Sequence, residues 1–316
     1  MTVKPRVLVV AKRSAYESYG QRAALAKRLL AERDPTVARI VPAHEEHVAT
    51  LAAVRACLAA LGARTRFVRA SRAGGAWFPD GAFDLVVTVG GDGTLLAASH
   101  HVASGTPILG INSAPADSVG FFCAATRSDA SDALTLALRG EMRAVTLSRM
   151  QVVRNGRKVH NRVLNEALFC HASPAATSRY LLQLEGDDAR EGPRQEEQKS
   201  SGFWIGPAAG STAAQRSAGG RILRLSSKQL QLVVREPYTP RGVPLHLARA
   251  LLSGDERLVV RCKMRDARLF LDGDHTMIRC RLGDVLTFAR SADPLDVLGL
   301  PDRAMRAGFA TRPSSR

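Results

Sequence analysis

The chain is organised around one stretch, Asp84-Leu85-Val86-Val87-Thr88-Val89-Gly90-Gly91-Asp92-Gly93-Thr94-Leu95-Leu96. Its first half is an apolar run rich in β-branched residues, which is typical of a buried strand. A glycine-rich turn follows, and a helical pattern extends from Thr94 to about Ala103. Such a turn indicates an anion site, because glycine lets the backbone approach a phosphate closely and a helix N-terminus favours negative charge.

Asp92 is the unexpected residue of this turn. A carboxylate repels phosphate, so an acid in a phosphate-binding turn indicates chemistry rather than simple binding. Two roles fit: a base beside a transferring phosphoryl group, or a partner for a metal ion. The turn by itself leaves both roles open.

The composition predicts an ordinary soluble globular protein. The chain has 316 residues, of which 45% are hydrophobic and 23% are charged, enough for two domains or one large one. No apolar run reaches the length of a membrane span, so we expect no membrane partner. The N-terminal run Val7 to Val10 is too short for a signal peptide and is interpreted as a strand.

The cysteines indicate a reducing compartment. They are odd in number, scattered, and form no Cys-x-x-Cys pair, which argues against a disulfide framework or a zinc site. The five are Cys57, Cys123, Cys170, Cys262 and Cys280. We therefore expect a cytoplasmic protein.

The formal net charge of +16 has three interpretations. It is typical of some nucleic-acid binders. It also fits arginines spread over a solvated surface, which we favour because the arginines form no block and few aromatic residues accompany them. A third interpretation is a basic surface that attracts polyanionic substrates such as nucleotides. We expect no specific nucleic-acid partner.

Strands alternate with helices over residues 1–144. The expected strands are 6–11, 64–68, 84–90 and 107–112, and the expected helices are 18–32, 44–61, 94–103 and 129–139. Residues 34–42 and 71–81 are expected to be connections. This alternation predicts an α/β domain with a parallel, Rossmann-like sheet covered by helices. Ligands of such sheets lie at the carboxyl ends of the strands, where the glycine turn lies.

Residues 145–290 predict a second, mostly β domain. A hairpin is expected from 145–153 through Asn155-Gly156, because Asn-Gly favours a tight turn. Further expected strands are 164–171, 180–185, 202–206, 230–234, 257–262, 268–271, 277–281 and 285–289. The polar residues 185–200 are interpreted as a mobile loop. The tail, 291–316, is expected to pack back on the first domain.

The segment Gly206 to Gly220 interrupts this β pattern with small residues. We expect a loop, then a short helix capped by Ser211 or Thr212, and a Gly-Gly exit. Small side chains leave room for a planar ligand against the backbone. They also suit a tight crossover between strands, and the segment alone favours the crossover.

Three motifs, taken in order, resemble the NAD kinase family. They are Gly90-Gly91-Asp92-Gly93-Thr94, Asn165-Glu166, and Gly210-Ser211-Thr212-Ala213 with Ser217-Ala218-Gly219-Gly220. The first motif also resembles diacylglycerol and sphingosine kinases, and phosphofructokinases carry a similar turn, but the ordered set is more specific. The resemblance extends from about Arg6 to about Ala289. Segments that resemble the mitochondrial-type branch and its bacterial relatives are Val9–Lys12 with Tyr16-Glu17, Gly110–Pro115 and Gln198–Gly202.

The resemblance implies a phosphofructokinase-like α/β domain plus a β-rich domain, with the active site between them, in a homodimer or larger assembly. It implies transfer of the terminal phosphoryl group of ATP to the 2′-hydroxyl of the adenosine ribose of NAD, which yields NADP. A divalent metal ion, Mg²⁺, is the implied cofactor. The donor remains open between ATP and polyphosphate, and the acceptor between NAD and NADH.

The resemblance also implies roles for individual residues. Asp92 corresponds to the catalytic carboxylate, and no metal ligand is assigned. The implied phosphate-binding residues are Gly91, Gly93 and Thr94. The implied dinucleotide-binding residues are Asn165 and Glu166, for a ribose or the nicotinamide end, and Thr212, Ala213 and Ser217, for the adenine and ribose pocket.

Two positions depart from the family pattern. Ser201 stands where many members have an aspartate that helps to bind NAD, although serine also occurs in the branch named above. Ala214 stands where many members have a tyrosine whose ring packs in the nucleotide pocket. The lost ring leaves NAD affinity and the NAD-versus-NADH preference open.

Two other functions remain as alternatives. The first is a lipid kinase of the diacylglycerol or sphingosine type, which would use the same turn and needs an apolar substrate groove in the β domain. The second is a non-catalytic nucleotide or polyphosphate sensor, which the altered pocket residues favour and the intact Asp92 opposes.

Overall fold

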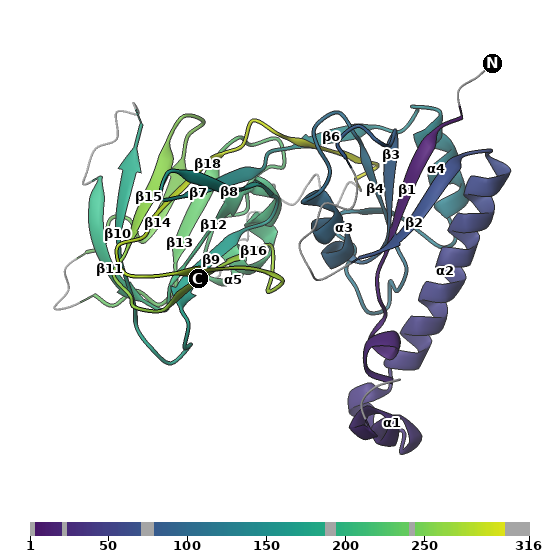
Figure 1. Cartoon of the computed structure of the whole chain (residues 1–316), viewed down its shortest axis with the longest axis horizontal. Coiled ribbons are helices and arrows are strands. Elements are labelled where there is room, and N and C mark those ends of the chain that lie inside the picture. Colours follow the sequence, from purple (N-terminus) through teal and green to yellow (C-terminus); the bar gives the residue numbers. More distant parts are fainter. Residues whose placement is uncertain (1–3, 21–23, 71–78, 187–193, 240–243, 301–316) are drawn as a thin grey trace, which may run out of the picture. The chain divides into compact units, whose positions relative to one another are not determined.

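The computed structural model describes residues 4–20, 24–70, 79–186, 194–239 and 244–300 (Figure 1). The described residues form two compact units. The first takes its residues from 4–70, 79–146 and 295–300, and the second takes its residues from 147–294. The predicted connection 71–81 lies mostly outside the described residues.

The first unit contains a seven-stranded sheet in the order β2-β1-β3-β4-β19-β6, with β5 also paired to β4. Its strands are β1 (Arg6–Ala11), β2 (Arg64–Arg69), β3 (Leu85–Gly90), β4 (Ile108–Asn112), β5 (Cys123–Thr126), β6 (Ala144–Leu147) and β19 (Leu295–Leu298). The pairs β1–β2, β1–β3, β3–β4, β4–β5 and β4–β19 are parallel. The prediction of a parallel α/β architecture is confirmed.

The described residues of this unit contain the helices α1 (Ala24–Ala31), α2 (Ile40–Ala60), α3 (Asp92–Ser99) and α4 (Ala130–Leu138), with a π-helical turn at Tyr16–Gly20 and a 3₁₀ turn at Pro35–Val37. Two of these helices, α2 and α3, begin earlier than predicted. Helix α2 includes Pro42, which is tolerated in a first turn because no intrahelical N–H bond is required there. Helix α3 begins at Asp92, not at Thr94, and it ends at Ser99, not near Ala103.

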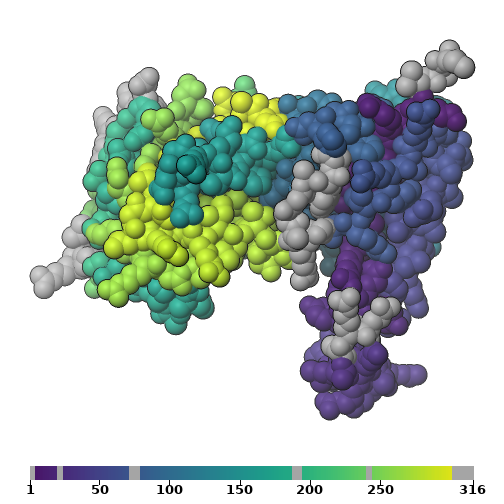
Figure 2. Space-filling model, viewed as in Figure 1, coloured from purple at the N-terminus to yellow at the C-terminus, as the bar shows by residue number. Residues whose placement is uncertain are grey.

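Helices cover the sheet through its buried side chains. Val9 and Val87 pack in one apolar cluster with Val54 and Leu58 of α2 and with Leu134 of α4. Helix α1 has no buried residue among its described side chains. Figure 2 shows that this part of the chain protrudes from the rest of the first unit. Among the described residues, we find no helix with the length and apolar character needed to cross a bilayer.

The second unit is built from two six-stranded sheets, in the orders β11-β10-β15-β18-β7-β8 and β14-β13-β12-β9-β16-β17. Its strands are β7 (Met150–Arg154), β8 (Arg157–Val163), β9 (Ala167–His171), β10 (Ser178–Glu185), β11 (Gln195–Ser200), β12 (Phe203–Pro207), β13 (Leu230–Val234), β14 (Arg249–Leu252), β15 (Arg257–Cys262), β16 (Ala267–Leu271), β17 (Thr276–Cys280) and β18 (Val285–Arg290). One hydrophobic cluster joins the two sheets, with the Phe203 ring 5.1 Å from the Tyr180 ring and 5.4 Å from the Phe169 ring. The predicted mostly β architecture is confirmed.

The predicted hairpin is correct at its turn and wrong at its first strand. Asn155 and Gly156 have φ values of 50° and 76°, the left-handed conformation that a two-residue type I′ turn requires. However, the residues expected as one strand, 145–153, divide between β6 and β7. The first of these strands belongs to the parallel sheet of the first unit.

The polar segment 185–200 is partly a strand, which corrects the expectation of a mobile loop. Residues Gln195–Ser200 form β11 and pair antiparallel with β10, at the edge of the sheet. Their buried side chains, Gln198 and Ser200, are polar, so the period-2 alternation carries no hydrophobic signal. Strand β14 is likewise absent from the predicted elements.

Arg149, near the first residue of the second unit, binds Asp293 and Pro294 at its last residues. Its fully buried guanidinium donates from Nε to the carbonyl oxygen of Asp293 and from Nη2 to the Asp293 carboxylate, both at 2.6 Å. Nη2 also donates to the carbonyl oxygen of Pro294 at 3.0 Å. Arg162 donates to the other carboxylate oxygen of Asp293 at 2.6 Å. Burial lowers the pKa of Arg149 to about 10, which leaves the group cationic at neutral pH.

Candidate functional site

The predicted phosphate turn lies at the carboxyl end of β3, as parallel-sheet topology requires. Gly91 is the N-cap of α3, Asp92 is its first residue, and Gly93 and Thr94 follow in the first turn. The backbone N–H of Thr94 donates to the carbonyl oxygen of Gly91 at 2.9 Å. The structure therefore brings these four predicted residues together at one helix N-terminus.

The carboxylate of Asp92 is held by two backbone amides from a distant part of the chain. Oδ2 accepts from the N–H of Phe121 at 2.9 Å, and Oδ1 accepts from the N–H of Phe122 at 2.8 Å. Each oxygen keeps further lone-pair capacity for a substrate proton or a cation. The acid is thus fixed in position, and it remains partly accessible.

The glycines of the turn differ in their surroundings. A Cβ at Gly90 would overlap the side chain of Thr94, and a Cβ at Gly91 would overlap the hydroxyl of Ser118. A Cβ at Gly93 would meet nothing within 4 Å, and Gly93 is exposed. Packing therefore explains the first two glycines, while the third leaves open space that a phosphate group can use.

Helix α2 holds the loop that leads from β4 to the Phe121 and Phe122 amides. His47, 1% exposed, lies with Nδ1 2.9 Å from the hydroxyl of the fully buried Ser113. Burial, and then the charges of Lys12 and Arg69, lower the pKa of His47 to about 4, so the ring is neutral at physiological pH.

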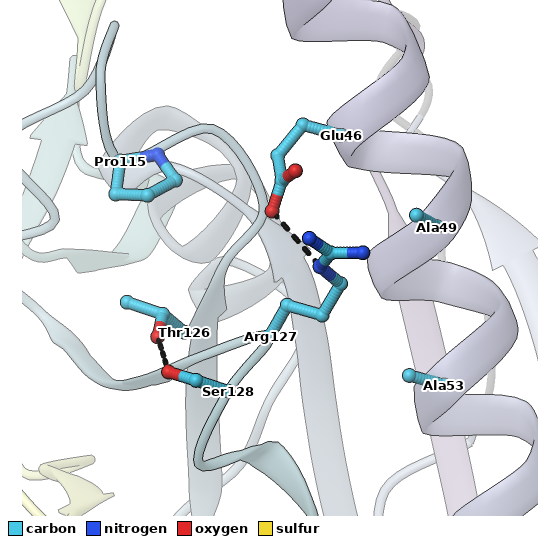
Figure 3. Close-up of a pocket in the computed structure, with 7 residues that line it drawn as sticks. All are labelled: Glu46, Ala49, Ala53, Pro115, Thr126, Arg127 and Ser128. Atoms are coloured by element: carbon cyan, nitrogen blue, oxygen red, sulfur yellow. Dashed lines mark hydrogen bonds and ion pairs between the residues drawn. The ribbon is translucent and has the colours of Figure 1, made fainter.

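Two ion pairs attach α2 or the residue before it to nearby loops. Arg39 pairs with Asp117 at 2.5 Å, and Arg127 pairs with Glu46 at 3.2 Å. Figure 3 shows the Arg127–Glu46 pair in a groove of about 560 Å³ between α2 and residues 126–128. This groove is lined by residues other than those of the predicted site, and its charged groups are paired.

Asn165 and Glu166 lie immediately before β9 in the second unit. Both residues are 8% exposed. Among the described residues, Asn165 Oδ1 and Glu166 Oε2 are buried and have no hydrogen-bond partner. Buried polar atoms normally have partners, so two adjacent exceptions indicate a place for polar ligand groups.

Asp272 holds this pair from the turn between β16 and β17. Its Oδ1 accepts from the backbone N–H of Asn165 at 2.7 Å and of Glu166 at 2.9 Å, and its Oδ2 accepts from the N–H of Leu164 at 2.7 Å. Burial, and then the charge of Asp272, raise the pKa of Glu166 to about 8.

The small-residue segment packs directly on Asn165. A Cβ at Gly210 would overlap the Asn165 carbonyl oxygen, and a Cβ at Gly206 would do the same. Gln215, fully buried, donates from Nε2 to that carbonyl at 3.3 Å. The close approach of the two backbones requires glycine, and it unites the second and third predicted motifs.

The remaining predicted residues lie in the same short segment. Thr212 ends the 3₁₀ turn Ala208–Thr212, Ala213 connects it to α5 (Ala214–Ser217), and Ser217 ends that helix. The predicted helix cap by Ser211 or Thr212 is wrong, because the N-cap is Ala213 without a side-chain bond. The Ser211 hydroxyl instead donates to the Ala208 carbonyl at 2.6 Å and accepts from the N–H of Leu223 at 2.9 Å.

Of the two departures from the family pattern, one precedes this segment and the other lies within it. Ser201 precedes β12, and its N–H donates to the carbonyl oxygen of Arg235 at 3.1 Å. Ala214 is the first residue of α5 and is partly exposed. The described residues contain no group of three or more His, Cys, Asp or Glu side chains arranged to hold a metal ion.

Several residues that support the site could not be predicted from the sequence. The Phe121 and Phe122 amides act through backbone atoms and so leave no side-chain signal. Gln215 is a buried amide inside a segment interpreted from its small residues. Asp272 had the clearest signal, since Asp-Gly directly after a strand marks a turn, but the sequence does not say which amides its carboxylate meets.

Comparisons with known proteins give one consistent result. Residues 7–142 match the family model described as ATP-NAD kinase N-terminal domain. A probable NADH kinase of Oryza sativa subsp. japonica is 35% identical over 240 residues, which cover 71% of this chain and 73% of that protein. An NADH kinase of Arabidopsis thaliana is 34% identical over 229 residues, which cover 68% of this chain and 72% of that protein.

Bacterial and archaeal proteins are similar as well. An NAD kinase of Acidithiobacillus ferrooxidans is 32% identical over 220 residues, which cover 67% of this chain and 69% of that protein. The crystal structure of an NAD kinase from Archaeoglobus fulgidus in complex with ATP has a TM-score of 0.64 at 20% identity, with 96% of this chain and 97% of that chain covered. This last likeness shows that the fold is shared.

Proposed function

Because this chain belongs to the NAD kinase family, we propose that it transfers the terminal phosphoryl group of ATP to the 2′-hydroxyl of the adenosine ribose of NAD. The observation that carries the mechanism is the carboxylate of Asp92, fixed by two amides at the N-terminus of α3. Two relatives are named as NADH kinases, so NADH is the second acceptor to be tested.

Asp92 is the proposed general base. A ribose hydroxyl is a weak nucleophile that must lose its proton as its oxygen bonds to the γ-phosphorus. The proton moves to Asp92, the bond from the γ-phosphorus to the bridging oxygen breaks, and ADP leaves. A positioned carboxylate typically contributes about 10²–10⁴-fold to the rate. Alignment and charge neutralisation supply most of the rest.

The ATP phosphates are proposed to lie against the first turn of α3. The free amides and helix dipole there favour anions, and the open space at Gly93 admits a phosphate oxygen without steric conflict. Gly91 and Thr94 shape the same turn. These residues orient the γ-phosphate, while Asp92 faces the acceptor hydroxyl.

Mg²⁺ is the proposed metal cofactor. The ion commonly binds through one or two carboxylates together with substrate phosphates, and needs no all-protein cage. The lone pairs left on Asp92 fit that demand. When bound, the ion neutralises phosphate charge.

The second unit is proposed to bind the dinucleotide. Asn165 Oδ1 and Glu166 Oε2 are buried acceptors that ribose hydroxyls would satisfy. Thr212, Ala213 and Ser217 would line the adenine side of the same pocket, since their segment packs on Asn165 through Gly210. Ser201 and Ala214 then decide how tightly the dinucleotide is held.

We propose a homodimer or larger homo-oligomer, a cytoplasmic location, and no specific nucleic-acid partner. All five cysteines are free, which supports a reducing compartment.

One assay tests the function. Purified protein is incubated with ATP, Mg²⁺ and NAD, and the product is detected with an NADP-specific dehydrogenase. Parallel reactions replace NAD by NADH, with NADPH measured, and ATP by polyphosphate. We expect NADP from ATP and NAD. Well-folded protein that yields neither NADP nor NADPH would exclude the proposal.

A further inference from the structure

We propose that Asp272 is a positioning residue that holds Asn165 and Glu166 in place for the dinucleotide. The proposal rests on the proposed function of the second unit and adds to it a residue outside the three recognised motifs. Asp272 lies more than a hundred residues beyond Glu166, in the turn between β16 and β17.

The contacts are directed at backbone atoms, not at the side chains that would meet the ligand. The Asp272 carboxylate accepts three N–H groups in a row, those of Leu164, Asn165 and Glu166, at 2.7–2.9 Å. In return, the N–H of Asp272 donates to the Glu166 carbonyl at 2.9 Å. These four bonds fix the backbone of the pair and leave both side chains available.

The backbone of Asp272 is specialised for this contact. Its φ of 50° is left-handed, a conformation that Asn, Asp and Gly adopt more readily than other residues. This conformation turns the chain directly after β16, and the carboxylate reaches the amides that precede β9, the strand paired with β16. Three charge-assisted bonds to one carboxylate are stronger than bonds to a neutral acceptor.

Asp272 also acts on Glu166 through charge. The pKa of Glu166 is raised by burial first and by the negative charge of Asp272 second. Arg149, which is paired with Asp293, also interacts with Asp272 electrostatically. An ionised Glu166 accepts ribose hydroxyls more strongly than the protonated acid does. Dinucleotide affinity should therefore rise as the pH increases through about 8.

The test compares Asp272→Asn and Asp272→Gly with Asp274→Asn. Asn and Gly both tolerate the left-handed backbone, so we expect both variants to fold. Asp274 lies in the same turn with its side chain 83% exposed, which makes it a matched control. The readouts are kcat, the KM for NAD, and equilibrium binding of NAD by calorimetry, from pH 6 to pH 9.

The expected result is a change in KM rather than in kcat. Asp272→Asn should raise the KM for NAD about 10-fold, because a neutral acceptor replaces the charged one. Asp272→Gly should raise the KM further, because it removes the acceptor altogether. The kcat should stay within about threefold, and Asp274→Asn should match the wild type. In Asp272→Asn, the pH-dependent fall in KM should move to lower pH, because the charge that raises the pKa of Glu166 is gone.

Glu166→Gln provides the second comparison. This variant keeps the backbone that Asp272 holds but cannot titrate, so the pH-dependent fall in KM should disappear. Adding Asp272→Asn to Glu166→Gln should then raise KM without changing its pH dependence.

Several results would overturn the inference. They are an unchanged KM and pH profile in Asp272→Asn, a loss of kcat alone, or failure of both Asp272 variants to fold, which would make Asp272 a support of the whole unit. A wild-type enzyme that binds NAD but makes no NADP would contradict the proposed function instead. The calorimetric comparison would still test Asp272.

Discussion

The Oδ1 oxygen of Asp92 lies 2.8 Å from the backbone nitrogen of Phe122, thirty residues further along the chain. The first turn of α3 and the residues before β5 therefore meet at one carboxylate. The acid is oriented before any substrate binds, as a preorganised catalytic group requires. A similar arrangement, with a different aspartate and different amides, holds Asn165 and Glu166.

Replacing Asp92 by asparagine should abolish most turnover. The amide cannot take up the hydroxyl proton, so we expect kcat to fall by about 10²–10⁴-fold. Nucleotide binding should persist, because the helix N-terminus remains. The measurement is NADP formation beside calorimetric binding of ATP and NAD. Asp132→Asn, an exposed acid in the first turn of α4, is the control and should retain full activity. Near-normal turnover of Asp92→Asn would remove Asp92 as the base.

Gly93→Ala should separate stability from activity. A Cβ at Gly93 meets nothing within 4 Å, and alanine favours a helix by about 0.5–1 kcal/mol over glycine. The free energy of unfolding in urea should therefore stay equal or rise. The KM for ATP should increase at least about fivefold if a phosphate uses that space, a loss of about 1 kcal/mol. An unchanged KM would place the phosphates elsewhere.

Gly210→Ala should damage both stability and dinucleotide binding. The added methyl would overlap the Asn165 carbonyl oxygen, and overpacking costs about 1–3 kcal/mol. Thermal unfolding and the KM for NAD measure the two effects. Gly254→Ala is the matched control in the same unit, because its nearest neighbour, a side-chain atom of Arg290, lies 3.8 Å from the added Cβ. If the two variants have equal unfolding temperatures and equal KM values for NAD, the close packing of Gly210 on Asn165 is contradicted.

His47 should make the fold less stable in acid. Its folded-state pKa of about 4 lies below the unfolded value of 6.5, so the unfolded chain binds an extra proton between these pH values. The free energy of unfolding should fall as the pH drops from about 6.5 to about 4, by up to about 3 kcal/mol from this group.

Urea unfolding at pH 4, 5, 6 and 7 measures this effect in the wild type and in His47→Asn. Asparagine can replace the Nδ1 contact to Ser113, and the variant should lose this part of the pH dependence. His275→Asn, a more exposed histidine, is the control. If the free energy of unfolding varies with pH in the same way in His47→Asn and in the wild type, His47 is not the group that makes the fold less stable in acid.

The sequence predicted the parts of the fold that carry a hydrophobic pattern. The strand of Leu85–Gly90 and the Asn155-Gly156 turn appear where expected, because burial and left-handed φ values each select particular residue types. Strand β11 was missed because its buried positions are polar. The assignment of β6 was wrong because local alternation does not show which sheet a strand will join.

The candidate site was predicted only at its motifs. Asp92, Asn165 and Glu166 could be named from residue type and order. Their supports could not, since Phe121 and Phe122 act through backbone amides and Asp272 acts across more than a hundred residues. Sequence spacing gives no information on contacts of that separation.

The position of β19 has a consequence for biosynthesis. In the sheet order, β19 lies between β4 and β6, although residues 148–294 separate it from β6 in the sequence. A ribosome therefore releases β1 to β6 well before the strand that connects β4 to β6 exists. At roughly 5–20 residues per second, the delay is on the order of ten seconds. During that interval Ile108 of β4 lacks its partner Val297, and this part of the strand edge is left open to pairing with another chain.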